Sequence, residues 1–292
     1  MSGELYAIAC AFLWALSSAL IKSQVHKMPV VSLGAWRTVP ALLLYWGLLL
    51  FSRRAGELFE LPLRTWAFLA GSTLVGLVVG DLLYFQSMKR IGLSRAMPLS
   101  TTYPFFTMIL ALLFLDEQLG WAVVVGALLI AAGAYLLAFP RQARLKGSDE
   151  IQDVNLPGVA LALAAALCWA TSTVMLRVGL EGMDITIANV VRLSVLMIAL
   201  LPMALRQSKG GQFKKYGLPA LSIVFLAGIV GTGLGTFAFL TAVQRAGAAR
   251  TSILTSATPL FGVPFSLILK ERVSRRTLLG TALTVAGVWL TV

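Results

Sequence analysis

The sequence predicts an all-α, polytopic membrane protein of ten transmembrane helices, arranged as two inverted five-helix repeats. Its composition, its long apolar runs and an internal duplication support this prediction. Of its 292 residues, 58% are hydrophobic and only 12% are charged, whereas soluble proteins carry about 25% charged residues. The composition therefore excludes an ordinary soluble domain.

Apolar runs long enough to span a bilayer account for most of the chain. Crossing about 30 Å of hydrocarbon as a helix takes about 20 residues. The runs are unbroken, which excludes the shorter, alternating strands of a membrane β-barrel. The ten expected spans are residues 5–22, 31–51, 66–88, 96–115, 120–139, 157–176, 186–205, 217–242, 251–269 and 277–292.

The chain is duplicated. Shifted by 155 residues, it aligns with itself at residue types that have positional meaning, which predicts two copies of one structural unit. We expect a first repeat over residues 1–140, a linker over 141–155 and a second repeat over 156–292. The aligned pairs include Trp14 with Trp169, Arg37 with Arg192, Gly76 with Gly231, Gly80 with Gly235, Pro104 with Pro259 and, after a one-residue deletion, Glu117 with Glu271.

Five spans in each repeat mean that the second repeat enters the membrane from the opposite side. Inverted repeats are a recurrent design of secondary transporters, with the substrate site at their interface. The first span could be mistaken for a secretory signal, but residues 1–4 carry no positive charge. Because this span also aligns with one deep in the second repeat, we expect it to remain as a transmembrane helix.

The net charge is +12, and the cations lie in loops beside the span ends. Such loops are typical of contact with anionic lipids, so we expect membrane lipids and no nucleic acid as partners. Of the 24 Lys and Arg residues, 16 follow odd-numbered spans and 6 lie on the opposite side. The positive-inside rule then places both termini outside the cytoplasm. Cys10 and Cys168 lie in spans at non-equivalent positions, where we expect thiols without a disulfide.

Pro104 and Pro259 lie near the middle of the fourth and ninth spans, where a proline removes a helical hydrogen bond. The residues before each proline are unusually polar for a span. Paired helix breaks at matching positions indicate a transporter binding site. The alternative is that the prolines only shape helix packing and the hydroxyls replace lost hydrogen bonds. The predicted binding residues of this region are Ser100, Tyr103, Thr255 and Thr258.

Charged residues inside a span are costly and indicate function by default. Arg37 lies about six residues into the second span, and Asp81 lies about seven residues before the third span ends. Those two span ends share a membrane side, so at 1.5 Å per residue both charges lie roughly 10 Å deep. We predict an Arg37–Asp81 pair at the binding site. A purely structural salt bridge, or an arginine that reaches the headgroups, is the alternative.

The second repeat departs from this pattern. Arg192 repeats Arg37, but Thr236 stands at the position that matches Asp81. An unpaired buried guanidinium presents a planar fork of donors, which suits an anionic group of a substrate. We therefore include Arg192 among the predicted binding residues.

Trp14 and Trp169 lie about ten residues into their spans, too deep for an interfacial aromatic belt. We expect both to line the cavity, with tight packing as the alternative. Tyr84 completes the set of predicted binding residues. Glu117 and Glu271 end the fourth and ninth spans, where we expect them to mark the membrane interface.

These features together resemble the EamA-type branch of the drug/metabolite transporter superfamily. They are the five plus five spans, Trp-Ala in the first span of each repeat, Arg in the second, Pro then Glu in the fourth, and Gly-rich fifth spans, over residues 4–292. The resemblance implies export or exchange of small polar metabolites such as amino acids, usually driven by a proton or counter-substrate gradient. It also implies cytoplasmic termini, opposite to the charge count, so orientation stays open.

We therefore predict a secondary active transporter of the cytoplasmic membrane, monomeric or homodimeric, without metal or cofactor. A flippase for a lipid carrier or lipid-linked headgroup is the main alternative. An intramembrane enzyme is disfavoured because Asp81 has no second intramembrane Asp and the single histidine, His26, lies in a loop. A passive channel is disfavoured because inverted repeats suit alternating access.

Overall fold

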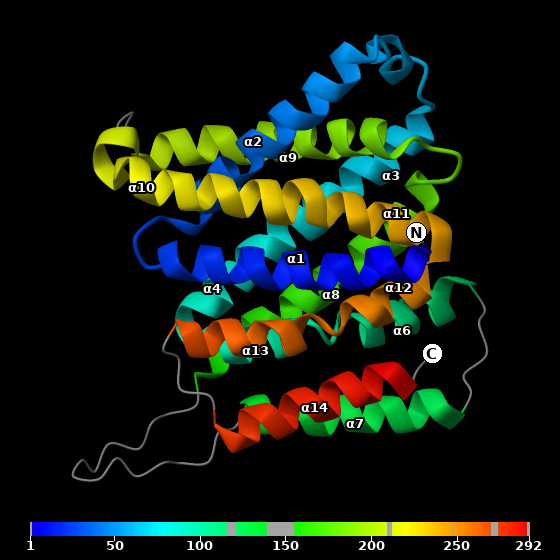
Figure 1. The fold of residues 1–292 in the computed structure, drawn as a ribbon. Coiled ribbons are helices and arrows are strands. Elements are labelled where there is room, and N and C mark those ends of the chain that lie inside the picture. Colours follow the sequence, from blue (N-terminus) through cyan, green and yellow to red (C-terminus); the bar gives the residue numbers. More distant parts are fainter. Residues whose placement is uncertain are drawn as a thin grey trace.

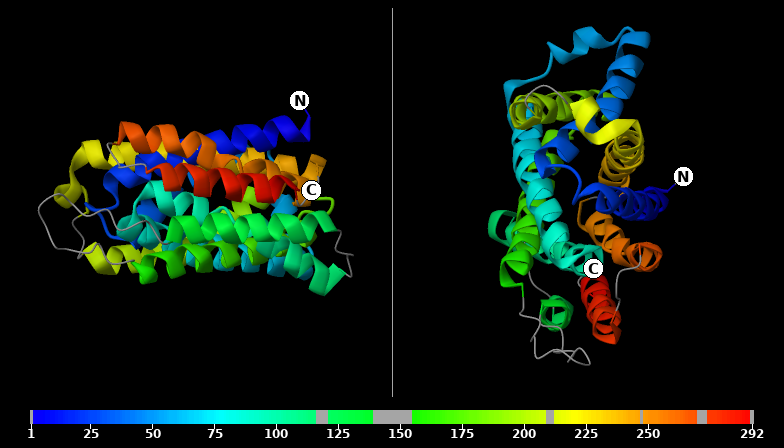
Figure 2. Two further views of the ribbon diagram at one scale, coloured as in Figure 1. Left: turned by 90° about the horizontal axis from the view of Figure 1, so that it is seen from below. Right: turned by 90° about the vertical axis from the view of Figure 1, so that its left-hand side faces the viewer.

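The computed structural model describes residues 2–115, 121–138, 155–208, 212–246, 248–269 and 274–290, and within them it is helical without β-strands. The helices form one bundle and run roughly along a common direction (Figures 1 and 2). Glu117 and Glu271 lie outside the described residues, as does most of the expected linker.

The predicted first repeat contains α1 (Gly3–Gln24), α2 (Val30–Phe51), η1 (Ala55–Leu58), α3 (Leu63–Ser72), η2 (Thr73–Gly80), α4 (Asp81–Ile91), α5 (Leu93–Ser100), α6 (Tyr103–Leu115) and α7 (Trp121–Ala138). The second contains α8 (Leu156–Gly179), α9 (Ile185–Ser208), α10 (Gln212–Ala227), η3 (Gly228–Gly235), α11 (Thr236–Ala246), α12 (Ala248–Thr255), α13 (Thr258–Ile268) and α14 (Arg275–Leu290). The segment η1 is a short 3₁₀ turn, whereas η2 and η3 are π-helical.

Large apolar side chains lie exposed on the outside of the bundle. Leu43 is 67% exposed and Ile198 is 74% exposed, and many other leucines are open to the same surroundings. Such a surface is stable against lipid, in which helices also satisfy their own backbone hydrogen bonds. Cys10 and Cys168 are both free thiols, as expected.

Within the described residues, seven helices are long and apolar enough to cross a membrane. The expected count of ten is not confirmed, because α7 and α14 and the pair α5–α6 are not among the seven. The expected span 96–115 is divided at Thr101 and Thr102 into two helices, and the described part of α14 has 16 residues. The all-helical, multi-span class is nevertheless clear.

The prolines of the fourth and ninth spans begin helices rather than interrupt them. The first break follows Ser100, and Pro104 is the second residue of α6. The second break follows Thr255, and Pro259 is the second residue of α13. The mid-helix placement was wrong, because a proline in the first turn lacks only an amide that would have no helical partner there. The paired breaks themselves are present at matching positions.

The two repeats pack against each other reciprocally. Ser17 Oγ of α1 donates to the Ala227 carbonyl at 2.8 Å, and Ser172 Oγ of α8 donates to the Ser72 carbonyl at 2.7 Å. These pairs are equivalent under the 155-residue shift, with the partners exchanged between repeats. Contacts that exchange in this way are those of a pseudo-two-fold arrangement.

The helices α7 and α14 occupy equivalent places in the two repeats and lie side by side at one edge of the bundle (Figures 1 and 2). A Cβ on Gly133 would meet the Gly280 carbonyl at 2.7 Å, and a Cβ on Gly287 would meet the Gly126 carbonyl at 2.6 Å. Because the numbers rise in one helix as they fall in the other, the two equivalent helices run antiparallel.

The glycines that end the two π-helical segments allow a close approach between elements of the two repeats. A Cβ on Gly80 of η2 would lie 2.9 Å from Trp169 Cδ1, and a Cβ on Gly235 of η3 would lie 2.8 Å from Trp14 Cδ1. Only glycine fits at such separations. These two glycines therefore position the indole rings of Trp14 and Trp169 at the centre of the bundle.

Candidate functional site

A central cavity lies between the two repeats. Its empty volume is about 1050 Å³, counting its solvent-open part, which is a suitable scale for a small molecule. Its wall is formed by α1, α2, α4, α8, α9 and α11, by the π-helical segments η2 and η3, and by the helices on either side of the paired breaks, α5, α6, α12 and α13. All ten predicted binding residues line it: Trp14, Arg37, Asp81, Tyr84, Ser100, Tyr103, Trp169, Arg192, Thr255 and Thr258.

Asp81 connects three helices on one wall of the cavity, the first wall, which contains Asp81, Arg37, Tyr84 and Trp169. Its Oδ2 pairs with Arg37 Nη2 of α2, and its Oδ1 accepts a hydrogen bond from Trp169 Nε1 of α8 at 2.9 Å. The Arg37 guanidinium also lies over the Phe85 ring, 4.8 Å from its centroid. The predicted Arg37–Asp81 pair is confirmed, and both oxygens of this buried carboxylate have partners.

The equivalent residues Thr236, Arg192, Phe239 and Trp14 form the second wall, which has two aromatic rings like the first wall but no carboxylate. Trp14 packs on Phe239 with ring centroids 4.9 Å apart, as Trp169 packs on Tyr84 at 5.2 Å. The equivalent of Asp81 is Thr236, whose hydroxyl donates to the Gly231 carbonyl at 3.4 Å. The second wall therefore has the same shape in this region without a negative charge.

Arg192 lies at the cavity with unused hydrogen-bond donors. Its side chain is only 3% exposed, and neither Nε nor Nη1 has a hydrogen-bond partner among the residues that the structure describes. Among the described residues no carboxylate forms an ion pair with it. Asp81 attracts the Arg192 charge from a greater distance, but its own ion pair is with Arg37. The cavity wall holds two arginines and one aspartate, so its formal charge is +1.

Hydroxyl groups hold the paired helix breaks together. Tyr103 OH and Thr255 Oγ1 lie 2.7 Å apart and join the two breaks across the cavity. Ser100 Oγ donates to the Ala96 carbonyl, Thr255 Oγ1 to the Thr251 carbonyl and Thr258 Oγ1 to the Thr255 carbonyl. These hydroxyls satisfy backbone carbonyls, as the packing alternative required, and they also line the cavity.

The cavity includes residues that were not among the predicted binding residues. Ser17 and Ser172 line it while they bond the opposite repeat, and Phe85 supports the Arg37 guanidinium. The two serines follow the tryptophans by one helical turn, a spacing that predicts a place on the cavity, and the structure confirms it. Thr232 of η3 also lines the wall, and its hydroxyl has no hydrogen-bond partner among the described residues. Its Gly-rich surroundings carry no pattern that would single it out.

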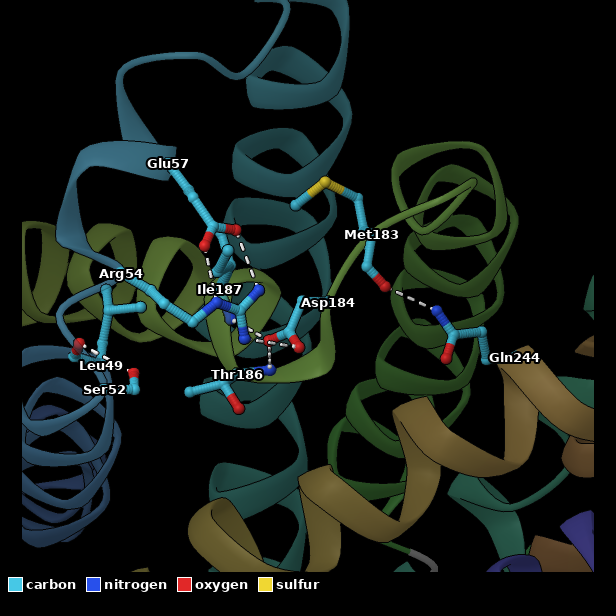
Figure 3. Close-up of polar contacts among 9 residues, drawn as sticks. All are labelled: Leu49, Ser52, Arg54, Glu57, Met183, Asp184, Thr186, Ile187 and Gln244. Atoms are coloured by element: carbon cyan, nitrogen blue, oxygen red, sulfur yellow. Dashed lines mark hydrogen bonds and ion pairs between the residues drawn. The ribbon is translucent and has the colours of Figure 1, made fainter.

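A second polar cluster lies outside the spans, where loops of the two repeats meet (Figure 3). Arg54 Nε and Nη2 donate to the two Glu57 oxygens at 2.6 and 2.9 Å, and Nη1 donates to Asp184 Oδ2 at 3.1 Å. Asp184 Oδ1 accepts the backbone N–H groups of Thr186 and Ile187 at 2.8 and 3.1 Å, which caps α9. We refer to Arg54, Glu57 and Asp184 as the Arg54 cluster.

Hydrogen bonding to Arg54 holds the pKa of the Glu57 carboxyl below its ordinary value. Burial raises the pKa of Asp184, but hydrogen bonds from Arg54 and from the capping amides outweigh it, so this pKa also lies below its ordinary value. Both carboxyls are therefore charged at neutral pH, and the cluster ties a first-repeat loop to the start of a second-repeat helix.

Comparison with known proteins identifies the family. The sequence matches the EamA-like transporter family over residues 1–139 and 156–292. The chain belongs to the EamA-like transporter family. It is accordingly a multi-pass membrane transporter and not an enzyme.

Individual relatives of this EamA-like transporter match it along nearly the whole chain. It is 25% identical over 287 residues to an uncharacterized transporter of Archaeoglobus fulgidus, covering 98% of this chain and 96% of that protein. It is 24% identical over 267 residues to the uncharacterized inner membrane transporter YhbE of Escherichia coli K12, covering 91% and 81%. A crystal structure of a protein that is 21% identical in sequence superposes on this structure with a TM-score of 0.66. The superposition covers 99% of this chain and 95% of the other, so the two proteins have the same fold.

Proposed function

We propose that this EamA-like transporter is a secondary active transporter that exports or exchanges small polar metabolites, such as amino acids, across the cytoplasmic (inner) membrane by alternating access. In this proposal ten spans form two inverted repeats. The ten predicted binding residues, all of which line the cavity, contact the substrate. The observation that carries the proposal is a central cavity, with a buried ion pair in its wall, at the meeting of two reciprocally packed repeats.

Reciprocal packing supports alternating access on energetic grounds. The Ser17–Ala227 and Ser172–Ser72 bonds are equivalent and nearly equal in length. Exchanging the conformations of the two repeats would therefore give a second packing of similar contacts, open to the opposite side. Two states of similar energy are what a substrate needs in order to shift the population between them.

Asp81 supports the coupling of transport to a proton. Its carboxylate holds Arg37 of α2 and Trp169 of α8 at the same time. Protonation would weaken both bonds together and loosen three helices at the cavity. A counter-substrate that competes for Arg37 would act on the same contact.

The test uses purified protein reconstituted into proteoliposomes that are preloaded with a pool of unlabelled amino acids. We expect a labelled amino acid from that pool to accumulate transiently above equilibrium, because each exit of unlabelled substrate returns a carrier to the outside. Protein-free liposomes are the control. Uptake that rises only to equilibrium would favour a channel, and movement of a lipid-linked probe without soluble transport would favour a flippase.

A further inference from the structure

The two walls of the cavity differ in one electrostatic respect. On the first wall the positive charge of Arg37 is paired with the negative charge of Asp81, which also accepts a hydrogen bond from Trp169 Nε1. On the second wall Arg192 retains its charge, and at least two of its guanidinium nitrogens have no partner in the part of the chain that the structure describes. Thr236 offers only a hydroxyl at the place of the missing carboxylate.

We propose that Arg192 binds the carboxylate or phosphate group of the transported molecule, so that the substrate itself supplies the acid that the second repeat lacks. This assignment rests on the proposed transport function and adds the charge of the substrate to it. It also gives the substrate an orientation, with its anionic group toward α9 and the remainder in the central cavity.

Burial explains why Arg192 needs such a partner. A charged group removed from water is stable only when it is paired and hydrogen-bonded. Arg192 is only 3% exposed, yet its Nε and Nη1 donors have no partner in the described part of the chain. The wall carries a formal charge of +1, so one monoanionic group would make it neutral.

The chemistry of the side chain narrows the ligand. A guanidinium is planar and always charged, and its fork of N–H donors matches two oxygens of a carboxylate or phosphate. A cationic substrate would instead bring a second positive charge toward Arg192, while Asp81 is already engaged. The cavity thus favours acids over their amides or alcohols.

The test measures binding of matched compounds to the detergent-purified full chain by thermal shift. One series pairs L-amino acids with their amides, and another pairs nucleoside monophosphates with nucleosides. We expect the acid of each active pair to bind at least ten-fold more tightly. Arg192→Gln should abolish this preference through a 10- to 100-fold loss for the acid, about 1.4–2.8 kcal/mol, whereas Arg192→Lys should lose only part of it.

Two further variants, which both keep Arg192, distinguish loss of the anion site from a general loss of folding. Thr236→Asp supplies an acid at the position equivalent to Asp81, so it should compete with the ligand for Arg192 and weaken binding of acids without removing the arginine. Arg54→Gln removes an arginine outside the cavity and should leave the acid preference intact. Each variant must elute as a single monodisperse species before it is compared.

The outcomes separate this inference from the transport function. If amides or cations are transported in proteoliposomes and Arg192→Gln leaves the preference unchanged, the anion site is overturned and the transporter stands. If acids bind through Arg192 but no soluble compound is transported, the anion site stands and the proposed function fails. Stabilisation only by a phosphate-bearing lipid would likewise support Arg192 as an anion site and overturn transport of soluble metabolites.

Discussion

The two repeats share a scaffold but not a charge pattern. Their serine–carbonyl bonds measure 2.7 and 2.8 Å, and their tryptophans pack on aromatic neighbours at 5.2 and 4.9 Å. Asp81 in one repeat and Thr236 in the other break this symmetry at the cavity. Conformational exchange benefits from equal packing, whereas recognition of a substrate in one orientation needs unequal walls. The positions that differ are therefore the best indicators of what is bound.

The largest effect is expected from Asp81→Asn. The change leaves the buried Arg37 guanidinium without a counter-charge, and breaking a buried pair from one side costs about 3–5 kcal/mol. We expect a clear fall in thermal stability and loss of gradient-driven transport, measured by melting and by proteoliposome uptake at two pH values. The matched change Thr236→Asn, at the equivalent position of the second repeat, should have little effect on stability because it removes no charge.

A double variant distinguishes coupling from structure at this pair. Asp81→Asn combined with Arg37→Gln removes both charges and should recover much of the lost stability. If transport returns as well, the pair is structural only. Wild-type transport with an unchanged pH dependence in Asp81→Asn alone would remove this aspartate from the mechanism.

The features that the two repeats share could be predicted from the sequence. The 155-residue shift predicted which residues are equivalent, and equal depths predicted that Arg37 would meet Asp81, because depth along a helix follows from its rise per residue. All ten predicted binding residues lie on one cavity, since polar residues and helix breaks in lipid gather where protein or water can satisfy them. Their contact with substrate remains a prediction.

Other features depend on contacts that no local pattern encodes. The Trp169–Asp81 hydrogen bond joins residues 88 positions apart. The π-helical geometry of η2 and η3 was missed because Gly-rich apolar sequence is equally compatible with an α-helix. The sequence predicts Pro104 and Pro259 in the middle of helices because a proline that follows polar residues is compatible both with a break inside a helix and with the first turn of a new helix.

A second prediction tests the symmetry of the scaffold. A Cβ on Gly76 would collide with Ser172, and a Cβ on Gly231 would collide with Ser17. Gly76→Ala and Gly231→Ala should therefore destabilise the protein to a similar extent, by about 1–3 kcal/mol each from overpacking. Thermal melting in one detergent gives the comparison.

Gly47 provides the control for these glycines. It lies inside α2, and a Cβ there would meet no atom of the described residues within 4 Å. Gly47→Ala should be neutral or should stabilise the helix by up to about 1 kcal/mol. A large difference between the Gly76 and Gly231 variants would contradict the equivalence of the two packing interfaces.

The smallest effect on stability is expected at the Arg54 cluster. This cluster is a further difference between the repeats, because the equivalent positions cannot form the same set of ion pairs. Pro29 stands at the position that matches Asp184, so a symmetric cluster cannot form at the opposite end of the bundle. These side chains are more than a third exposed, and such ion pairs contribute little in water. Arg54→Gln should therefore lower the melting temperature only slightly at pH 7, with transport largely retained.

The pH dependence of that small effect follows from the lowered pKa values of Glu57 and Asp184. Carboxyls with a depressed folded-state pKa stabilise the protein above their ordinary pKa, near pH 4, and lose that contribution as the pH falls through the lowered value. The difference between wild type and Arg54→Gln should hence be constant above the ordinary pKa of the two carboxyls and should shrink as the pH falls through their lowered pKa values. Asp184→Asn is the matched control, because its amide oxygen can still cap α9 while the ion pair is lost. An Arg54→Gln deficit that persists undiminished at the lowest pH would mean that Arg54 acts by packing, and not through its charge.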